Sequence, residues 1–267
     1  MKPNFLVIGA PRAGTTWIAR NIMEHPDIYV PRGKELHFFD RQFSKGIEFY
    51  EGKFSQVARE KAIGDVTPDY LADSECPARI AGSLENLKFI VTLRNPVDRL
   101  YSRYWNAEGK KHKRTGRSFE DRLIEVPSWT EEGYYDVHLS RYFKYFSREQ
   151  FLILFFDDLK SRPVEFLRSI FDFLDVDTDF TPARRDHVMN AAGAKPLNAR
   201  SASMYWLHRV ARRLGFDKLS SYLDVINTNS VPEMSTETRR QLIDNTYAQT
   251  ITNVEDMFSR DLSAWRN

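Results

Sequence analysis

Hydrophobic residues gather in three short runs that predict β-strands, at residues 5–8, 89–93 and 151–156, and each run is apolar on both faces. Segments with a helical spacing of apolar residues follow, among them 16–23 and 163–174. After the second run, Asn95 can cap a helix that begins at Pro96. Strands that are apolar on both faces and alternate with helices are typical of a parallel sheet covered on both sides. We therefore predict an α/β fold with a P-loop-like core.

A charged segment and a helical C-terminal part complete the pattern. Residues 107–133 carry many charges, including a basic cluster at 110–114, and show little periodicity, so we expect an exposed loop or lid there. The last third, from about residue 200, has a mostly helical pattern, and Ser235 stands before a long amphipathic helix. No linker divides the chain, and we expect a single domain over residues 1–267.

Composition and charge narrow the classes of protein. With 42% hydrophobic and 28% charged residues, the chain of 267 residues has the composition of a soluble globular protein. Its 39 basic and 37 acidic residues nearly balance, so an anion site must be local and a nucleic-acid partner is not expected. The single cysteine, Cys76, excludes an intrachain disulfide and a thiolate metal site and favours a reducing compartment. No run approaches the about 20 apolar residues of a membrane helix. We expect a cytoplasmic protein.

A glycine-bounded loop follows the first predicted strand. Gly9 and Gly14 have the G-x-x-x-x-G spacing of a phosphate-binding loop between a strand and a helix. Backbone N–H groups in such a turn converge on phosphate oxygens. The residue after Gly14 is Thr15, where a nucleoside triphosphatase carries lysine, and the cation of the loop is instead Arg12. A cation at that position suits a shorter chain such as a 5′-phosphosulfate, although the same spacing also occurs in ordinary strand-to-helix turns.

The loop also resembles a known motif. Residues 11–17, PRAGTTW, resemble the 5′-phosphosulfate loop P-K-S-G-T-T-W of sulfotransferases that use 3′-phosphoadenosine 5′-phosphosulfate (PAPS), with Arg12 in place of the usual lysine. A guanidinium still donates hydrogen bonds to sulfuryl oxygens. The resemblance implies that the donor is bound by six loop residues: Arg12, Ala13, Gly14, Thr15, Thr16 and Trp17. Trp17 either stacks on adenine or faces the core.

A second anion site is expected at the carboxyl end of the second predicted strand, the usual ligand edge of a parallel sheet. Residues 92–102 resemble the family's 3′-phosphate motif, and this implies that Arg94 and Ser102 hold the 3′-phosphate. Residues 190–196 resemble a loop that covers the nucleotide, where Lys195 is the candidate and a surface lysine is the alternative. Further stretches extend the resemblance to bacterial and glycan sulfotransferases over essentially the whole chain.

Sulfuryl transfer needs a base near the acceptor hydroxyl and a cation near the leaving phosphate. Arg12 is the expected cation. Residues 34–40, KELHFFD, resemble a segment of heparan sulfate and bacterial sulfotransferases in which the glutamate is the base. The resemblance implies that role for Glu35.

Two further polar residues are candidates for the site. His37, within the same segment, is the alternative base. Its other interpretation is a structural histidine whose ring is hydrogen-bonded to the backbone at the edge of an aromatic cluster. Residues 64–70 resemble a family segment that often carries lysine in the glycan enzymes, where this chain has Val66. Because this chain lacks that lysine, Asp65 is the residue of this segment that we expect to orient the acceptor.

Two other classes of function remain as alternatives. A P-loop kinase or nucleoside triphosphatase would use Asp157 or Asp158 as the Mg²⁺-binding acid, but the lysine after Gly14 is missing. A module that binds RNA or a membrane surface would use the basic stretches 110–117 and 208–213, but the chain has no overall basic excess.

The sequence therefore favours a PAPS-dependent sulfotransferase. The expected acceptor is a hydroxyl of a carbohydrate or glycolipid, with a lipid, polyketide or phenol as the alternative. The histidines show no ligand spacing, so no metal is expected. The oligomeric state does not follow from the sequence.

Overall fold

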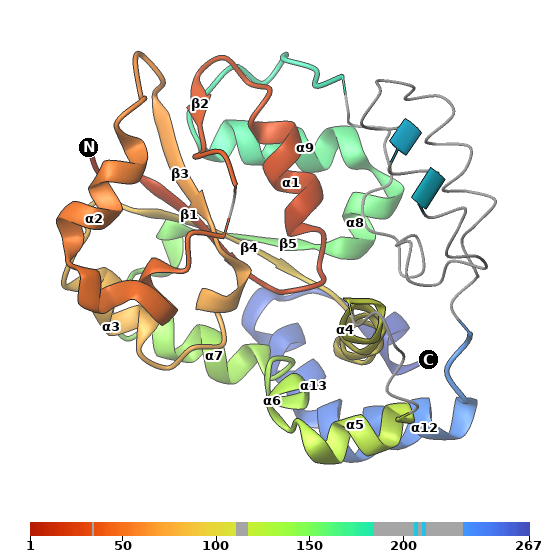
Figure 1. Ribbon diagram of the computed structural model, residues 1–267. Coiled ribbons are helices and arrows are strands. Elements are labelled where there is room, and N and C mark those ends of the chain that lie inside the picture. The colour runs from red at the N-terminus through yellow and green to blue at the C-terminus, as the bar shows by residue number, and fades with distance from the viewer. Residues whose placement is uncertain (34, 111–116, 184–205, 208–209, 212–231) are drawn as a thin grey trace.

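A computed structural model describes residues 1–33, 35–110, 117–183, 206–207, 210–211 and 232–267. Within them lies a five-stranded sheet in the order β2-β3-β1-β4-β5, and every neighbouring pair of strands is parallel (Figure 1). The strands are β1 (Phe5–Gly9), β2 (Ile28–Tyr29), β3 (Ala62–Val66), β4 (Lys88–Leu93) and β5 (Phe151–Phe155). The predicted α/β class and the three predicted strands are confirmed.

Helices cover the sheet and extend beyond it (Figure 1). The α-helices are α1 (Thr15–Ile22), α2 (Ile47–Glu51), α3 (Cys76–Ala81), α4 (Pro96–Lys110), α5 (Phe119–Glu125), α6 (Ser128–Glu131), α7 (Tyr135–Tyr142), α8 (Phe156–Ser161), α9 (Pro163–Phe173), α12 (Thr236–Gln241) and α13 (Ala248–Phe258). Shorter 3₁₀ or π-helical segments are η1 (Phe38–Gln42), η2 (Phe43–Lys45), η3 (Gly52–Phe54), η4 (Pro68–Tyr70), η5 (Arg148–Gln150), η7 (Leu242–Tyr247) and η8 (Ser263–Arg266).

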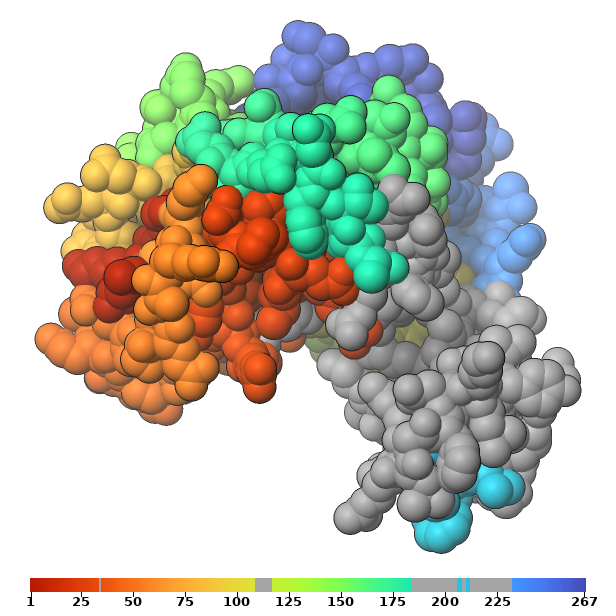
Figure 2. Space-filling view, turned by 90° about the horizontal axis from the view of Figure 1, so that it is seen from above, coloured from red at the N-terminus to blue at the C-terminus, as the bar shows by residue number. Residues whose placement is uncertain are grey.

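Alternate residues of β1 enter two separate cores, one on each face of the sheet. Phe5 and Val7 pack with residues of α1 and α9. Figure 2 looks onto that face and shows α1, in red-orange, beside α9, in turquoise. Leu6 and Ile8 pack on the opposite face with residues of α3, α7 and α13. Full burial of an aliphatic or aromatic side chain contributes about 1.5–3 kcal/mol, so both faces need a helical cover.

Two predicted helix starts are confirmed by their caps. The Asn95 Oδ1 accepts a hydrogen bond of 3.0 Å from the Val97 N–H at the start of α4. The Ser235 Oγ accepts one of 3.0 Å from the Thr238 N–H at the start of α12. Each cap satisfies an N–H group that has no partner inside its helix. The helical C-terminal part is confirmed for residues 232–267.

The expected loop or lid at residues 107–133 is wrong for its described residues. The segment holds the end of α4, then α5 and α6, and residues 111–116 lie outside the described part. A capping box of Ser118 and Asp121 begins α5, and Phe119 is buried against the ring of Tyr104. Short helices that bury few apolar residues leave little periodicity, and this is why the pattern indicated a loop.

The sequence pattern did not predict β2 and β3. The third strand along the chain, β3, contains Gly64 and Asp65, and both residue types are depleted in strands. The ring of Phe5 in β1 occupies the space where a Cβ at Gly64 would lie, so a residue with a side chain would clash with this ring. The single-domain prediction for residues 1–267 stays a prediction.

Candidate active site

The loop between β1 and α1 leaves several backbone donors without partners. Gly14 has a φ of 92°, and a Cβ there would lie 2.7 Å from the Leu159 side chain, so the position requires glycine. Within the described part of the chain, the N–H groups of Gly14, Thr15 and Thr16 have no hydrogen-bond acceptor. Unpaired N–H groups at a helix N-terminus carry partial positive charge. This arrangement of donors suits an anionic ligand.

The side chain of Arg12 crosses from the loop to α4. Its Nε donates a 3.1 Å hydrogen bond to the Ser102 Oγ, and its Nη1 donates one of 3.3 Å to the Asn106 Oδ1. Ser102 is only 3% exposed. The sequence assigned Arg12 and Ser102 to the two ends of the donor, and the structure places them in contact. Asn106 was missed, although its spacing of four from Ser102 puts both on one helix face.

Arg94 lies directly after β4 and beside the same loop. Its Nη1 donates a 3.1 Å hydrogen bond to the Arg12 carbonyl, and its guanidinium carbon lies 4.8 Å from the centre of the Phe156 ring. The Tyr135 hydroxyl donates to the Arg94 carbonyl over 2.8 Å and fixes the backbone. The Arg94 Nε is buried and has no hydrogen-bond partner. This nitrogen is a donor held ready for a ligand.

The two guanidinium groups make the local field strongly positive. Burial, followed by the charges of Arg94 and Arg103, lowers the pKa of Arg12 to about 10. Burial also lowers the pKa of Arg94, against the opposing effect of Asp98. Both side chains still carry their charge at neutral pH. In the described part of the chain no carboxylate forms an ion pair with either, so an anion between them would relieve the repulsion.

Glu35 lies beside Val66, the last residue of β3. Its backbone has a φ of 71°, and its N–H donates a 2.9 Å hydrogen bond to the Val66 carbonyl. The side chain is exposed. Its charge opposes the lowering of the Arg12 pKa, which places the carboxylate within electrostatic reach of that guanidinium. The structure thus brings the predicted base and the predicted cation to one place.

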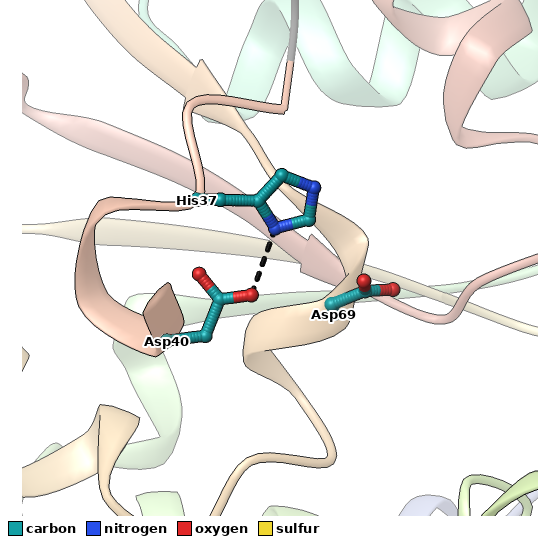
Figure 3. A group of neighbouring side chains, drawn as sticks. All are labelled: His37, Asp40 and Asp69. Atoms are coloured by element: carbon teal, nitrogen blue, oxygen red, sulfur yellow. Dashed lines mark hydrogen bonds and ion pairs between the residues drawn. The ribbon is translucent and has the colours of Figure 1, made fainter. Parts of the chain in front are cut away.

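His37 belongs to a small polar cluster with Asp40 and Asp69, drawn in Figure 3. The His37 Nδ1 lies 2.8 Å from the Asp40 Oδ2, so the carboxylate orients the ring and leaves the Nε2 for another partner. The backbone interpretation of His37 is therefore wrong, because a side chain holds the ring. The cluster has donor atoms within 4.8 Å of one another, as a metal site requires.

The Arg41 guanidinium lies beside the two carboxylates of this cluster. The Arg41 Nη2 donates to the Asp69 Oδ2 over 2.6 Å, and the Arg41 Nε lies 3.4 Å from the Asp40 Oδ2. This cation contacts both carboxylates and offsets one of their two negative charges, so a metal ion has less negative charge to balance there. The sequence expectation of no metal stays a prediction.

Asp65 lies in the core and not in the site. It is 1% exposed, and its carboxylate accepts hydrogen bonds from the hydroxyls of Thr67 at 2.7 Å, Tyr70 at 2.9 Å and Tyr50 at 3.1 Å. Burial raises the pKa of this carboxyl. The expectation that Asp65 orients an acceptor is wrong, because the carboxylate is enclosed by three internal donors.

The remaining predicted residues lie at different depths. The Trp17 indole is 6% exposed and packs edge-on against Phe166 at 6.1 Å between ring centres, which fits the core alternative. The Asp157 Oδ2 accepts from the Trp265 Nε1 over 3.0 Å, and the Asp158 Oδ1 accepts from Arg260 over 2.9 Å. These internal bonds argue against a free Mg²⁺-binding acid. Lys195 and both ends of the basic stretch 208–213 lie outside the described residues.

A cleft of about 650 Å³ opens beside the polar cluster. One wall carries Asp40 and Asp69, and the other is formed by α6, α7 and the residues between them. Arg103 of α4 also lines it, and this residue follows Ser102, whose Oγ accepts a hydrogen bond from Arg12. The cleft therefore lies near the loop between β1 and α1.

A phosphate-type loop, two half-buried arginines beside the ends of β1 and β4, and a polar cleft form the candidate site, and this arrangement suits an anionic ligand. The sulfotransferase domain family matches residues 2–221, and the chain belongs to this family.

Individual relatives agree with this assignment. Heparan sulfate glucosamine 3-O-sulfotransferase 3B1 of Mus musculus is 32% identical over 180 residues, which cover 64% of this chain and 46% of that protein. The membrane-associated sulfotransferase kil1 of Dictyostelium discoideum is 37% identical over 105 residues, or 38% of this chain and 22% of that protein. The chain thus spans less than half the length of these two relatives.

A solved structure covers the whole fold. A sulfotransferase from Alicyclobacillus acidocaldarius superposes with a TM-score of 0.76 at 25% sequence identity, and the match covers 100% of both chains. This chain therefore shares its architecture with that sulfotransferase.

Proposed function

We propose that this protein transfers a sulfuryl group from PAPS to a hydroxyl group of an acceptor. Membership of the sulfotransferase domain family supports the reaction class. The observation that carries the proposal is the junction of Arg12, Ser102 and Arg94, two cations and a hydroxyl in one place with no carboxylate bound to either cation in the described part of the chain. Such a set suits a ligand with two anionic groups.

The donor fits the groups that the site leaves unpaired. The Thr15 and Thr16 N–H groups suit the 5′-phosphosulfate, and the unpartnered Arg94 Nε suits the 3′-phosphate together with the Ser102 hydroxyl. Ser102 serves both as a ligand and as the anchor that holds Arg12 against α4.

The chain's own residues would perform three tasks in the reaction. When bound, the donor supplies an activated sulfuryl group on a phosphate leaving group. Arg12 stays protonated and stabilises the negative charge that develops on the departing phosphate. Glu35 accepts the proton of the acceptor hydroxyl as the oxygen attacks sulfur in line. The Glu35 backbone bond to Val66 fixes the segment that carries the base.

His37 is the second candidate for the base. Its Nδ1 is bound to Asp40, and this arrangement resembles the base-and-orienter pairs of nucleophilic enzymes. A neutral imidazole in that geometry can accept a proton at the Nε2. Substitution of Glu35 and His37 in parallel separates the two assignments.

The acceptor is proposed to be a carbohydrate or glycolipid hydroxyl, with a small lipid, polyketide or phenol as the alternative. The heparan sulfate relatives support a sugar, and the match to only part of their length leaves the acceptor itself a proposal. None of the helices in the described ranges combines the length and the apolar character of a membrane span. A cytoplasmic location and the lack of a nucleic-acid partner stay proposals.

A transfer assay tests the function directly. The purified protein is incubated with ³⁵S-labelled PAPS and a mixture of hydroxyl compounds, and the labelled products are separated from the donor. We expect label in an organic product and a matching release of 3′,5′-phosphoadenosine. If ATP with Mg²⁺ binds and the 3′-phosphorylated nucleotide does not, the proposal is wrong and a kinase function replaces it.

A further inference from the structure

The charges around the cleft indicate which acceptors can enter it. Within the described part of the chain, the cleft is lined by five carboxylates and three guanidiniums. The carboxylates belong to Asp40, Asp69, Asp73, Glu131 and Glu132. The guanidiniums belong to Arg41, Arg103 and Arg141.

Two of the three arginines are already paired with carboxylates of the walls. Arg41 pairs with Asp69 at 2.6 Å and with Asp40 at 3.4 Å. The Arg103 Nη2 lies 3.1 Å from the Glu132 Oε1, and the other oxygen of this carboxylate binds the buried Arg99 at 2.7 Å. With Arg99 included, the five carboxylates still outnumber the four guanidiniums.

The balance of the remaining groups is negative. Arg141 has no carboxylate partner among the described residues and reaches only the Ala72 carbonyl and the His138 Nδ1, each at 3.4 Å. Two carboxylates without a cation partner in the described ranges oppose this charge. Asp73 accepts hydrogen bonds from the N–H groups of Glu75 and Cys76, and the Glu131 carboxylate is exposed. His138 adds no positive charge, because burial lowers its pKa to about 4.

We propose that the acceptor of this enzyme is a hydroxyl compound without negative charge, neutral or amine-bearing, and that the cleft excludes sulfated or carboxylated glycans. The inference rests on the proposed sulfuryl transfer and specifies its acceptor. A polyanionic glycan would have to enter a cleft with more carboxylates than guanidiniums. The free cations of the site, Arg12 and Arg94, lie on the donor side, where the phosphates of the donor would neutralise them.

The test separates acceptors by charge. A metabolite and oligosaccharide extract is divided by ion exchange into anionic, neutral and cationic fractions, and each is incubated with the protein and ³⁵S-labelled PAPS. We expect transfer into the neutral or cationic fraction and none above background into the anionic one. Label in the anionic fraction overturns the inference, and so does the absence of label from the other two in a preparation that binds 3′,5′-phosphoadenosine. A preparation that does not bind this nucleotide refutes the proposed function itself.

A charge reversal at the cleft provides the matched variant. Glu131→Lys changes the local charge by two units, which at about 8 Å in water alters the relative use of an anionic acceptor by about fivefold. Glu85→Lys makes the same change at an exposed residue that does not line the cleft. We expect the ratio of anionic to neutral product to rise for Glu131→Lys and to stay constant for Glu85→Lys. Equal ratios in the two variants contradict the role of the cleft charge.

Discussion

Arg12 and Ser102 lie 90 positions apart in the chain, and a 3.1 Å hydrogen bond from the Arg12 Nε to the Ser102 Oγ joins them. The bond connects the loop after β1 to the middle of α4, the helix that begins beside Arg94. The groups proposed for the two ends of the nucleotide are therefore one connected unit. Loss of one member should disturb both ends.

Ser102→Ala tests this connection. The variant removes a hydroxyl donor for the 3′-phosphate and releases the Arg12 side chain, so the affinity for 3′,5′-phosphoadenosine should fall about tenfold. Calorimetry measures it, with Ser140→Ala on the exposed side of α7 as the control. An unchanged affinity would remove Ser102 from the site.

Glu35→Gln tests the base. The amide keeps the shape of the side chain but cannot take up a proton, so turnover should fall by at least about a hundredfold. Nucleotide affinity should stay nearly constant, and Glu48→Gln at an exposed position of α2 should retain full activity. The parallel variant His37→Asn should retain most of its turnover. The reverse pattern, with an active Glu35→Gln and an inactive His37→Asn, would assign the base to His37.

Glu132→Gln should destabilise the protein. Arg99 is 0% exposed, and its guanidinium binds the Glu132 Oε2 at 2.7 Å and the Trp129 carbonyl. Removal of the carboxylate leaves a buried charge without its counterion, and the free energy of unfolding should fall by about 3 kcal/mol. The neighbouring exposed variant Glu131→Gln should change it by less than about 0.5 kcal/mol. Similar values for both variants in urea unfolding would show that the ion pair does not stabilise the fold.

His138 gives the stability of the fold a pH dependence. Burial lowers the pKa of the folded imidazole to about 4, whereas the unfolded chain titrates near about 6.5. The unfolded state therefore binds more protons between these values, and the contribution of His138 is complete above pH about 6.5 and is lost as the pH falls towards about 4.

The variant His138→Gln isolates this contribution. Its amide can still donate to the Glu131 carbonyl, which the His138 Nε2 contacts at 2.8 Å, but it does not titrate. Between pH of about 7.5 and about 5, wild type should lose about 2 kcal/mol more stability than the variant. Equal losses in urea unfolding at the two pH values would show that His138 titrates normally in the folded protein.

The fold could be predicted from the sequence where all residues of a segment lie in the same apolar surroundings or where a contact is local in the chain. Residues of β4 and β5 are apolar throughout, and the cap at Asn95 depends only on local chemistry. The strand β3 could not be predicted, because Gly64 and Asp65 are atypical of strands and their partners lie elsewhere in the chain. The Phe5 ring packs over Gly64, and the Tyr50 hydroxyl donates to the Asp65 carboxylate. Local patterns do not record such partners.

The sequence predicted residues of the candidate site but not the contacts between them. Motifs identified Arg12, Arg94 and Ser102, but nothing in the sequence shows that the Arg12 side chain reaches α4. Asn106 was missed because an asparagine on a helix face has no signal of its own. The charges at residues 107–133 indicated solvent exposure, whereas Arg122 pairs with the buried Glu108 at 3.2 Å.

The central claim is that Arg94 and its neighbours recognise a nucleotide with a 3′-phosphate. Calorimetry of wild type and Arg94→Ala with 3′,5′-phosphoadenosine and with adenosine 5′-phosphate tests it most directly. We predict that wild type prefers the first nucleotide and that Arg94→Ala weakens its binding by more than about tenfold, with little effect on the second. Equal binding of both nucleotides by wild type, or an equal loss of both in the variant, would contradict the account.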